Sequence, residues 1–369
     1  MLVTGGAGFI GSHLVDELLS CGHRVRVIDN LDPQAHEGGV ARFVNPEAEL
    51  IIGDLRDRDA VAHSLEGVEY VFHQGGMVGN GQSMYELHRY VDVNAAGTAI
   101  LVEEVVRRHD HVRRLIAASS MVVYGEGCYR CVEHGILAPG LRREEDLRQR
   151  LWEPHCPRCG EELSPVPTDE DTALRPTSPY AISKRDCEEL VLVAGRAHGL
   201  ESVALRYLNV YGPRQALGNP YTGVAAIFCT RLLSGLRPIV FEDGDQRRDL
   251  THVSDIVQAN LLAMEAPSVV GQAINVGTGT SITVRELAAA LARSLDREDL
   301  TPAITGRYRA GDIRHCWADL TRAGELLGYA PQIERAAGLA ELARWVASES
   351  PVNRTDAATA ELSERGLIC

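Results

Sequence analysis

Lysine is almost absent from this sequence: Lys184 stands alone beside 36 arginines. A bias that removes every other lysine but spares one position indicates that this position requires an amine. Because the planar guanidinium of arginine differs from an ammonium group in size and hydrogen-bond direction, arginine would not substitute well there. We therefore expect Lys184 to have a chemical role.

Other features that define whole classes of protein are also missing. No run of about 18 apolar residues occurs, so no membrane span is expected. No basic or cleavable apolar segment precedes Leu2–Thr4, which predicts a cytoplasmic protein. Nine cysteines in 369 residues are too few and too irregular for a disulfide framework. A net charge of −14 disfavours nucleic acid as a partner, although a few local cations would suffice for a phosphate-bearing small molecule.

Short β-branched segments alternate with amphipathic segments over the first 120 residues. The predicted strands are 2–4, 24–29, 50–52, 70–73 and 114–119, and the predicted helices are 12–21 and 94–108. Such alternation predicts a parallel sheet covered by helices on both faces. With 45% hydrophobic residues the chain can bury a full core, so the predicted fold class is α/β with a doubly wound parallel sheet.

The pattern divides the chain into a sheet domain, residues 1–208, and a smaller substrate-binding lobe, residues 209–347. A stretch rich in Arg, Glu, Pro and Cys interrupts the first domain at 127–167, and its lack of apolar periodicity indicates an inserted loop. Helix 179–198 then resumes the alternation. The polar, alanine-rich tail at 348–369 is predicted to be loosely held.

A glycine-rich turn from Thr4 to Gly11 follows the first predicted strand and opens a helix. Glycines let the backbone approach a pyrophosphate, and the start of a helix supplies unpaired N–H groups and a positive dipole end. Asp29 lies 18 residues past Gly11, at the end of the second predicted strand. Its carboxylate would accept hydrogen bonds from both hydroxyls of the adenosine ribose and repel a 2′-phosphate, which favours NAD over NADP.

Tyr180 and Lys184 are four residues apart, so a helix places them one turn apart on the same face. A free phenol has a pKa near ~10 and is a poor base at neutral pH. A neighbouring ammonium group and a positive nicotinamide ring would both lower this pKa. We expect Tyr180 to remove a proton from a substrate hydroxyl while hydride passes to NAD⁺, and Lys184 to hydrogen-bond the nicotinamide ribose.

A hydroxyl partner for Tyr180 is expected where the fifth predicted strand ends, at Ser119 and Ser120. The carboxyl ends of the strands form the edge at which open α/β sheets bind ligands. Either serine would donate to the reacting oxygen or relay its proton to Tyr180. Spacing alone does not separate the two.

Five motifs together resemble the extended short-chain dehydrogenase/reductase family, which contains the NAD-dependent nucleotide-sugar epimerases and dehydratases. They are TGGAGFIG, SSMVVYG, YAISK, RYLNVYGPRQ and RRDLTHVSD, and the similarity runs from Leu2 to about Leu327 apart from the insertion. The resemblance implies a Rossmann-type sheet and a homodimer formed through a four-helix bundle. It selects Ser120, four residues before the tyrosine of the VYG motif, as the catalytic hydroxyl beside Tyr180 and Lys184.

The glycine-rich turn and the resemblance together assign residues to two ligands. Residues expected to bind NAD are Gly5, Gly8, Phe9, Ile10, Gly11, Asp29, Asn30, Asp54, Leu55, Gln74, Asn94, Tyr180 and Lys184. Residues expected to bind a nucleotide-diphosphate sugar are Ser120, Asn209, Val224, Arg248, Arg309 and Asp312. Arginine suits this role because its fork binds phosphate oxygens bidentately. One departure is Gln74, which stands in His-Gln-Gly-Gly where the family usually has His-Leu-Ala-Ala and alters the wall beside the nicotinamide.

The residues after Ser120 bear on the type of reaction. The family's 4,6-dehydratases carry an Asp-Glu pair there and its 3,5-epimerases carry side chains that handle a proton at carbon, whereas this chain has Met121 and Val122. Oxidation and return of hydride at one carbon remain, which predicts a 4-epimerase. The segments RYVDVNAAGT, NVYGPRQALGNPYTGV and FEDGDQRRD most resemble family members that act on dTDP-L-rhamnose. A dehydratase, reductase or decarboxylase stays open, as does a non-catalytic NAD sensor or scaffold, which the intact catalytic residues disfavour.

Four of the cysteines form two close pairs in the insertion, Cys128 with Cys131 and Cys156 with Cys159, separated by 24 residues. Each pair offers two thiolates from one tight turn, and four thiolates make a closed tetrahedral zinc site. A closed site leaves no position for water, so we expect a structural zinc that ties down the insertion. The alternative is four ordinary cytosolic thiols. The insertion lies between the predicted catalytic residues in sequence and is expected to cover the active site.

Overall fold

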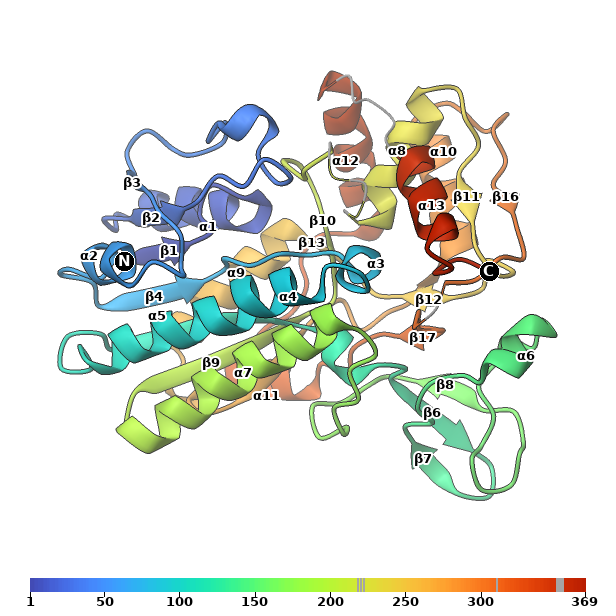
Figure 1. Ribbon diagram of the computed structural model, residues 1–369, viewed down its shortest axis with the longest axis horizontal. Coiled ribbons are helices and arrows are strands. Elements are labelled where there is room, and N and C mark those ends of the chain that lie inside the picture. The colour runs from blue at the N-terminus through green and yellow to red at the C-terminus, as the bar shows by residue number, and fades with distance from the viewer. Residues whose placement is uncertain (218, 220, 222, 310, 350–354) are drawn as a thin grey trace.

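The computed structural model describes residues 1–369 apart from 218, 220, 222, 310 and 350–354 (Figure 1). Its main element is a seven-stranded sheet. The strands are β1 (Leu2–Thr4), β2 (Arg26–Asp29), β3 (Glu49–Ile52), β4 (Tyr70–His73), β5 (Arg114–Ser120), β9 (Glu201–Tyr207) and β14 (Ala273–Val276). Their order is β14-β9-β5-β4-β1-β2-β3, and neighbouring strands are parallel throughout, which confirms the predicted α/β class. The chain order reverses between β1 and β4, where open sheets of this kind bind ligands.

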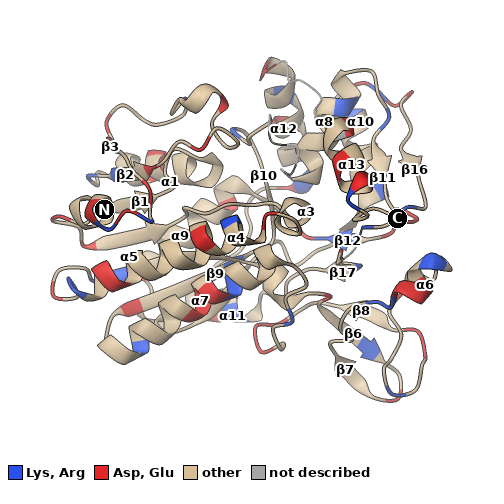
Figure 2. Ribbon diagram, viewed as in Figure 1, with Lys and Arg blue, Asp and Glu red and all other residues tan. Residues whose placement is uncertain are grey.

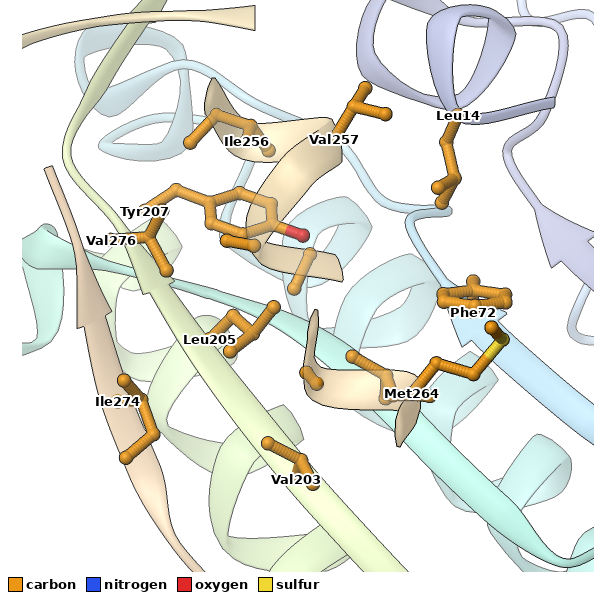
Figure 3. Packing of buried hydrophobic residues seen from close by; sticks show 14 of the residues in the cluster. Leu14, Phe72, Val203, Leu205, Tyr207, Ile256, Val257, Met264, Ile274 and Val276 are labelled. Carbon is orange, nitrogen blue, oxygen red and sulfur yellow. The ribbon is translucent and has the colours of Figure 1, made fainter. Parts of the chain in front are cut away.

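Helices cover both faces of this sheet. One layer contains α1 (Phe9–Ser20), α9 (Val253–Glu265) and α11 (Thr321–Leu327), and the other contains α2 (Arg58–Ser64), α5 (Gly97–Val106) and α7 (Pro179–His198). Within β5, Ile116 packs toward the first layer and Leu115 toward the second, because successive side chains of a strand point to opposite faces. Figure 3 shows the core beneath the first layer, with Phe72 of β4, Leu205 of β9 and Ile256 of α9.

Helix α7 covers the predicted residues 179–198 because both of its ends carry strong local signals. The Ser178 hydroxyl accepts a hydrogen bond from Ala181 N at 3.1 Å and caps the first turn. Pro179 occupies the first helical position, where a missing N–H costs no hydrogen bond. Gly199 ends the helix with a left-handed φ of 71°.

The predicted helix at 94–108 is interrupted at its start. Residues Val91–Ala96 form a π-helical segment, η2, and regular α5 begins only after it. Other short elements are η1 (Glu37–Gly39), α3 (Asn80–Ser83), α4 (Leu87–Tyr90), η3 (Met121–Tyr124) and η4 (Pro267–Val269). The π-helical segment carries Asn94, whose partners are described below.

A smaller lobe forms around a second core. Its helices are α8 (Val224–Leu233), α10 (Val284–Ser294) and α12 (Arg335–Glu349), which pack together through Phe228, Leu291 and Leu342. Its short strands are β10 (Asn209–Tyr211), β11 (Ile239–Val240), β12 (Arg247–Arg248), β13 (Leu250–His252), β15 (Ile282–Thr283), β16 (Ala303–Ile304) and β17 (His315–Cys316). Strand β12 pairs with β15 and β17, which places Arg248 opposite Cys316.

The insertion contains a small antiparallel sheet, which the lack of apolar periodicity did not reveal. Its strands are β6 (Cys128–Cys131), β7 (Gly135–Leu137) and β8 (Ser164–Val166), with β6 in the middle, and the helix α6 spans Glu144–Arg148. These strands are only three or four residues long, too short to show a period in the sequence. In Figure 1 the insertion projects beside β12 and β17.

The C-terminal tail is docked over its described part, contrary to the expectation of a loosely held segment. It contains the helix α13 (Thr355–Glu364). Backbone hydrogen bonds join Cys369 and Tyr308 in both directions, at 2.9 and 3.0 Å, and Arg231 forms an ion pair with Asp356. The tail therefore packs on the smaller lobe.

Acidic and basic residues both occur on the outer helices. Figure 2 shows both kinds on α7, whereas α5 carries acidic residues only. Among the residues that the structure describes, no helix combines the length and the apolar character needed to cross a bilayer.

Candidate active site

The glycine-rich turn between β1 and α1 fits closely against the loop after β4. Gly5 has a φ of +65°, and a Cβ built on it would lie 2.7 Å from Gly75 Cα. A Cβ on Gly11 would lie 2.2 Å from the carbonyl oxygen of Gly5. Both contacts are with backbone atoms, so a side chain at either position would require the backbone to move. The turn lies at the reversal of strand order, where a dinucleotide is expected.

The start of α1 presents unpaired backbone donors. Its N-cap, Gly8, offers no side chain to them, and the Ser12 N–H donates to the Gly8 carbonyl at 2.9 Å. The N–H groups of Phe9 and Ile10 precede this bond and have no partner within the helix. These donors and the positive end of the helix dipole suit the oxygens of a pyrophosphate.

Asp29 lies beside this turn at the end of β2. Its Oδ2 accepts a hydrogen bond from Ala7 N at 3.1 Å, and its Oδ1 accepts one from Leu31 N at 2.9 Å. His36 Nε2 approaches the same Oδ1 to 3.3 Å. No motif indicated His36, because it comes from an irregular loop. These neighbours fix the carboxylate at the edge of the crevice.

Asn30, Asp54 and Leu55 lie together along the same crevice. Asn30 Nδ2 donates to Asp54 Oδ2 at 2.9 Å, and a Cβ on Gly75 would lie 3.0 Å from Leu55 Cδ1. Arg56 donates two hydrogen bonds of 2.8 Å to the Asp54 carboxylate. These bonds hold the pKa of Asp54 well below its usual range, so this carboxylate is charged at neutral pH.

Ser120 and Tyr180 meet at the carboxyl edge of the sheet. Ser120 is the last residue of β5 and Tyr180 is the second residue of α7, and the Ser120 hydroxyl lies close enough to the phenol to act on its pKa. Ser119 faces away and donates to Glu188 Oε2 at 2.6 Å. Because side chains alternate along a strand, only one of the two serines reaches the phenol, and that residue is Ser120.

The surroundings of Tyr180 do not by themselves make its phenol acidic. Burial raises the pKa of Tyr180 to about 12, although the hydrogen bond with Ser120 acts in the opposite direction. Tyr90 packs edge-on against the phenol ring, with centroids 6.0 Å apart. The predicted lowering of this pKa therefore depends on the positive ring that NAD⁺ would add.

His73 is buried and Lys184 is half-buried, and the two bases lie close enough for the charge of one to act on the other. Lys184 Nζ donates to the carbonyl oxygen of Ala118, and burial lowers the pKa of Lys184. Burial and the charge of Lys184 lower the pKa of His73 to about 3. The neutral imidazole bridges Thr4 Oγ1 and Thr98 Oγ1, at 2.8 Å each. His73 was not singled out from the sequence, since a lone histidine at a strand end carries no specific signal.

Gln74 and Asn94, both expected to bind NAD, have partners within the chain. Gln74 Nε2 donates to Tyr207 Oη at 3.0 Å. Asn94 is buried on η2, where its Oδ1 accepts from Met77 N at 2.7 Å and its Nδ2 donates to Ser183 Oγ at 3.0 Å. Both side chains therefore hold the wall of the crevice in place, and a direct contact with the cofactor stays a prediction.

Three residues expected to bind substrate converge in the smaller lobe. Arg309 forms an ion pair of 3.0 Å with Asp312, and Arg248 approaches the same carboxylate to 3.5 Å. Although burial acts in the opposite direction, the nearby arginine charges lower the pKa of Asp312. The Thr177 hydroxyl donates to the Gly311 carbonyl at 3.0 Å, which joins this group to the segment just before Tyr180.

Asn209 and Val224 complete the residues expected on the substrate side. Asn209 begins β10, and its side-chain oxygen is buried without a hydrogen-bond partner among the described residues. An amide can present either its oxygen or its NH₂ at such a point, so a ligand that supplies the missing partner fits there. Val224 is half-buried at the start of α8 and packs partly on the core of the smaller lobe.

The insertion brings together three of the four predicted zinc ligands. The group whose ligand atoms all lie within 4.8 Å of one another is Cys131, His134, Cys156 and Cys159. Cys128 is not part of it, and its Sγ lies 2.9 Å from Thr172 Oγ1. Cys128 and Cys131 are three residues apart on β6, so their side chains point to opposite faces of the strand. The structure therefore groups His134, and not the predicted Cys128, with the other three residues.

Known proteins are similar to this chain in both sequence and fold. The dTDP-L-rhamnose 4-epimerase of Burkholderia thailandensis is 33% identical over 354 residues, which cover 95% of each chain. A putative UDP-glucose 4-epimerase of Methanocaldococcus jannaschii is 32% identical and covers 96% of this chain and 100% of its own. The structure of a Thermotoga maritima UDP-glucose 4-epimerase with UDP-glucose aligns with a TM-score of 0.76 at 31% identity, over 94% of this chain and 98% of that one.

The family model gives the same result over most of the chain. The model described as "NAD dependent epimerase/dehydratase family" matches residues 1–147 and 156–277. The break between these ranges falls inside the insertion, and the matched parts include the glycine-rich turn, Ser120, Tyr180 and Lys184. The chain belongs to the NAD-dependent epimerase/dehydratase family.

Proposed function

We propose that this protein is an NAD-dependent nucleotide-sugar 4-epimerase. The observation that carries the proposal is that Ser120, at the end of β5, and Tyr180, at the start of α7, come together at the edge of the sheet where the glycine-rich turn also lies. The two residues that follow Ser120 are Met121 and Val122, and neither can act as an acid or a base. Such a site can therefore oxidise a single carbinol carbon and return hydride to it, but it lacks the acid and base needed for loss of water.

Each catalytic side chain has a part in this reaction. NAD⁺ supplies the acceptor and donor of hydride when it is bound along the crevice. Tyr180 removes the proton from the 4-hydroxyl of the sugar and later returns it, and Ser120 donates a hydrogen bond to the same oxygen. Lys184 would hydrogen-bond the nicotinamide ribose, and the positive nicotinamide ring would favour the phenolate once NAD⁺ is bound. Between the two transfers the 4-keto sugar turns over, so that hydride returns to its opposite face.

The arginines of the smaller lobe support a nucleoside diphosphate as the part of the substrate held outside the reacting centre. Arg248 and Arg309 both flank Asp312, and Asn209 offers a buried polar atom that lacks a partner in the described chain. Among the sugars of the relatives we favour dTDP-L-rhamnose or a related 6-deoxy sugar, because the segments RYVDVNAAGT, NVYGPRQALGNPYTGV and FEDGDQRRD resemble family members that act on it. The relative of Burkholderia thailandensis, which is 33% identical, supports this choice.

A panel of nucleotide-sugars tests this function. The purified protein with NAD⁺ is incubated separately with dTDP-L-rhamnose, UDP-glucose, UDP-N-acetylglucosamine and UDP-glucuronic acid, which carries the carboxylate that a decarboxylase would release, and the products are followed by NMR. We expect one of them to equilibrate with its 4-epimer. Loss of water or of carbon dioxide would assign a dehydratase or a decarboxylase instead, and a panel that stays unchanged would favour a non-catalytic NAD-binding protein.

We also propose a structural zinc in the insertion. Cys131 Sγ lies 3.6 Å from Cys159 Sγ and 3.5 Å from His134 Nδ1, and that nitrogen lies 3.6 Å from Cys156 Sγ. A tetrahedral zinc with Zn–S near ~2.3 Å and Zn–N near ~2.0 Å separates its ligands by about 3.8 Å for two sulfurs and about 3.5 Å for sulfur and nitrogen. The group therefore fits zinc. Three thiolates and an imidazole close the coordination sphere, so the ion would stabilise the insertion and take no part in the reaction.

We propose in addition that two copies associate through α7 and the helices beside it. Ile182, Leu190 and Val193 of α7 are 36 to 53% exposed and share one face of the helix. Leu87 of α4 and Val91 of η2 are also exposed, and both elements contact α7. Exposed apolar residues clustered over adjacent helices are typical of an interface. We place the enzyme in the cytoplasm, a compartment that keeps thiols such as its nine cysteines reduced.

A further inference from the structure

One arginine of the insertion reaches into the substrate side of the molecule. The side chain of Arg142 is only 3% exposed and donates to both carboxylate oxygens of Glu242, at 2.8 and 3.0 Å. It also donates to Glu126 Oε1 and to the carbonyl oxygen of Asp312, both at 3.1 Å. Glu126 and Glu242 are themselves almost completely buried. A buried guanidinium with this many charged partners has a defined position.

A second buried arginine, Arg314, adds ion pairs between the insertion and the segment around Glu242. Arg314 is 1% exposed and pairs with Glu242 at 2.9 Å and with Asp243 at 2.7 Å. Its third partner, Glu153 at 2.6 Å, is again a residue of the insertion. The backbone of Glu242 adopts a left-handed φ of 53°, a strained conformation that persists only where surrounding contacts fix it. The insertion therefore contacts segment 312–314 through Arg142 and Glu153.

Arg248 also forms hydrogen bonds with segment 312–314. Its guanidinium donates to the carbonyl oxygens of Ile313 at 2.8 Å and Arg314 at 2.9 Å. The side chain is 13% exposed, so most of its donors are directed by these two carbonyls. Figure 2 shows the arginines of β12 between the smaller lobe and the insertion. The position of Arg248 therefore depends on the position of segment 312–314.

We infer that Arg142 is a positioning residue for the substrate diphosphate: it fixes segment 312–314, and this segment orients the Arg248 guanidinium. The inference rests on the proposed function, because it takes the diphosphate of a nucleotide-sugar as the ligand of Arg248. It gives the insertion a role in substrate affinity at a distance from the reacting carbon. The cofactor crevice shares none of the residues of this network.

The test compares three variants with the wild-type protein. Arg142→Ala removes the contact, Arg142→Lys keeps the charge but loses the fork, and Arg143→Ala is the control, because Arg143 is 74% exposed and pairs only with Asp146 of its own helix turn among its described ion pairs. Calorimetry measures the dissociation constants for dTDP, UDP and NAD⁺, and kinetics give kcat and KM for the substrate found above.

We expect Arg142→Ala to weaken nucleoside diphosphate binding and raise KM by about tenfold or more, since small misplacements of a binding group have effects of this order. The dissociation constant of NAD⁺ and kcat should stay close to wild type, Arg142→Lys should recover part of the affinity, and Arg143→Ala should match wild type. If Arg142→Ala does not fold, Arg142→Lys decides.

Three results would overturn the inference, and they are distinguishable. Wild-type affinity for dTDP and UDP in a folded Arg142 variant would remove the positioning role and leave the proposed function intact. A wild-type protein that binds no nucleoside diphosphate would remove the proposed function, and the inference with it. A fall in kcat with unchanged KM would also count against positioning, because it would place the effect in the chemical step.

Discussion

At the scale of single residues, the ring of Tyr180 packs against that of Tyr90, and the Ser120 hydroxyl lies near its phenol. Tyr180→Phe removes the oxygen that carries the proton. We expect turnover to fall by roughly a hundred- to ten-thousand-fold, the usual contribution of a general acid–base group, while NAD⁺ binding persists. Tyr70→Phe is a matched control, because its hydroxyl meets Arg113 at the far end of the sheet. Equal activity of Tyr180→Phe and wild type would exclude the phenol as the base.

Lys184 offers a second prediction at this scale. Its half-buried ammonium group donates to Ala118 O of β5, and a larger, planar guanidinium would direct its donors differently. We expect Lys184→Arg to lower kcat/KM by roughly a hundredfold. Retained activity in steady-state assays would show that charge alone suffices at this position.

His73 predicts a pH dependence of stability. Its pKa is lowered from 6.5 to about 3 in the folded chain, so the unfolded chain binds the extra proton at intermediate pH. The contribution of the neutral imidazole to the free energy of unfolding is fully present above pH 6.5. It is lost as the pH falls toward about 3, by up to about 5 kcal/mol in total. Urea unfolding of wild type and His73→Asn between pH 7 and about 4 measures this. Equal pH slopes for the two proteins would contradict it.

Only some of the contacts between residues of the site could be predicted from the sequence. The glycine-rich turn, Asp29 and the Tyr180–Lys184 spacing depend on local geometry and were predicted directly. The choice between Ser119 and Ser120 depends on which side chain of the strand faces Tyr180. The family resemblance selected Ser120, whereas spacing alone did not separate the two residues. The partners of His73 and Asn94 come from distant segments, so no local pattern contains them.

At the scale of elements, the alternation of side chains along β6 decides which cysteines meet. Cys131 faces His134 and the second pair, whereas Cys128 faces Thr172. We expect about one zinc per chain by elemental analysis, which His134→Ala weakens and Cys128→Ser leaves unchanged. The opposite pattern would restore the four-cysteine site, and metal-free wild-type protein would discard zinc altogether.

Elements with strong terminal signals were predicted well, and elements without them were not. Helix α7 has Ser178, Pro179 and Gly199 at its ends, and its bounds match the prediction. The π-helical segment η2 and the three strands of the insertion have no such markers. Their conformation is fixed by contacts with other parts of the chain, which single-sequence periodicity does not record.

At the scale of the whole molecule, the apolar face of α7 predicts the state of association. Replacing an interface leucine by a charged residue would bury that charge without a partner, so Leu190→Glu should shift a dimer toward monomer. Val132→Glu changes a side chain that is 99% exposed on the insertion and should leave the state unchanged. Analytical ultracentrifugation distinguishes the two outcomes, and a wild-type monomer at every concentration would refute the interface.

The scarcity of lysine has a practical consequence for anyone who handles this molecule. Acylating labels, amine-directed cross-linkers and enzymes that attach modifiers to lysine would find one lysine side chain in the chain, and it is half-buried on α7. Slow incorporation of such a reagent, and its suppression by dinucleotide, would report occupancy of the crevice without any coupled assay.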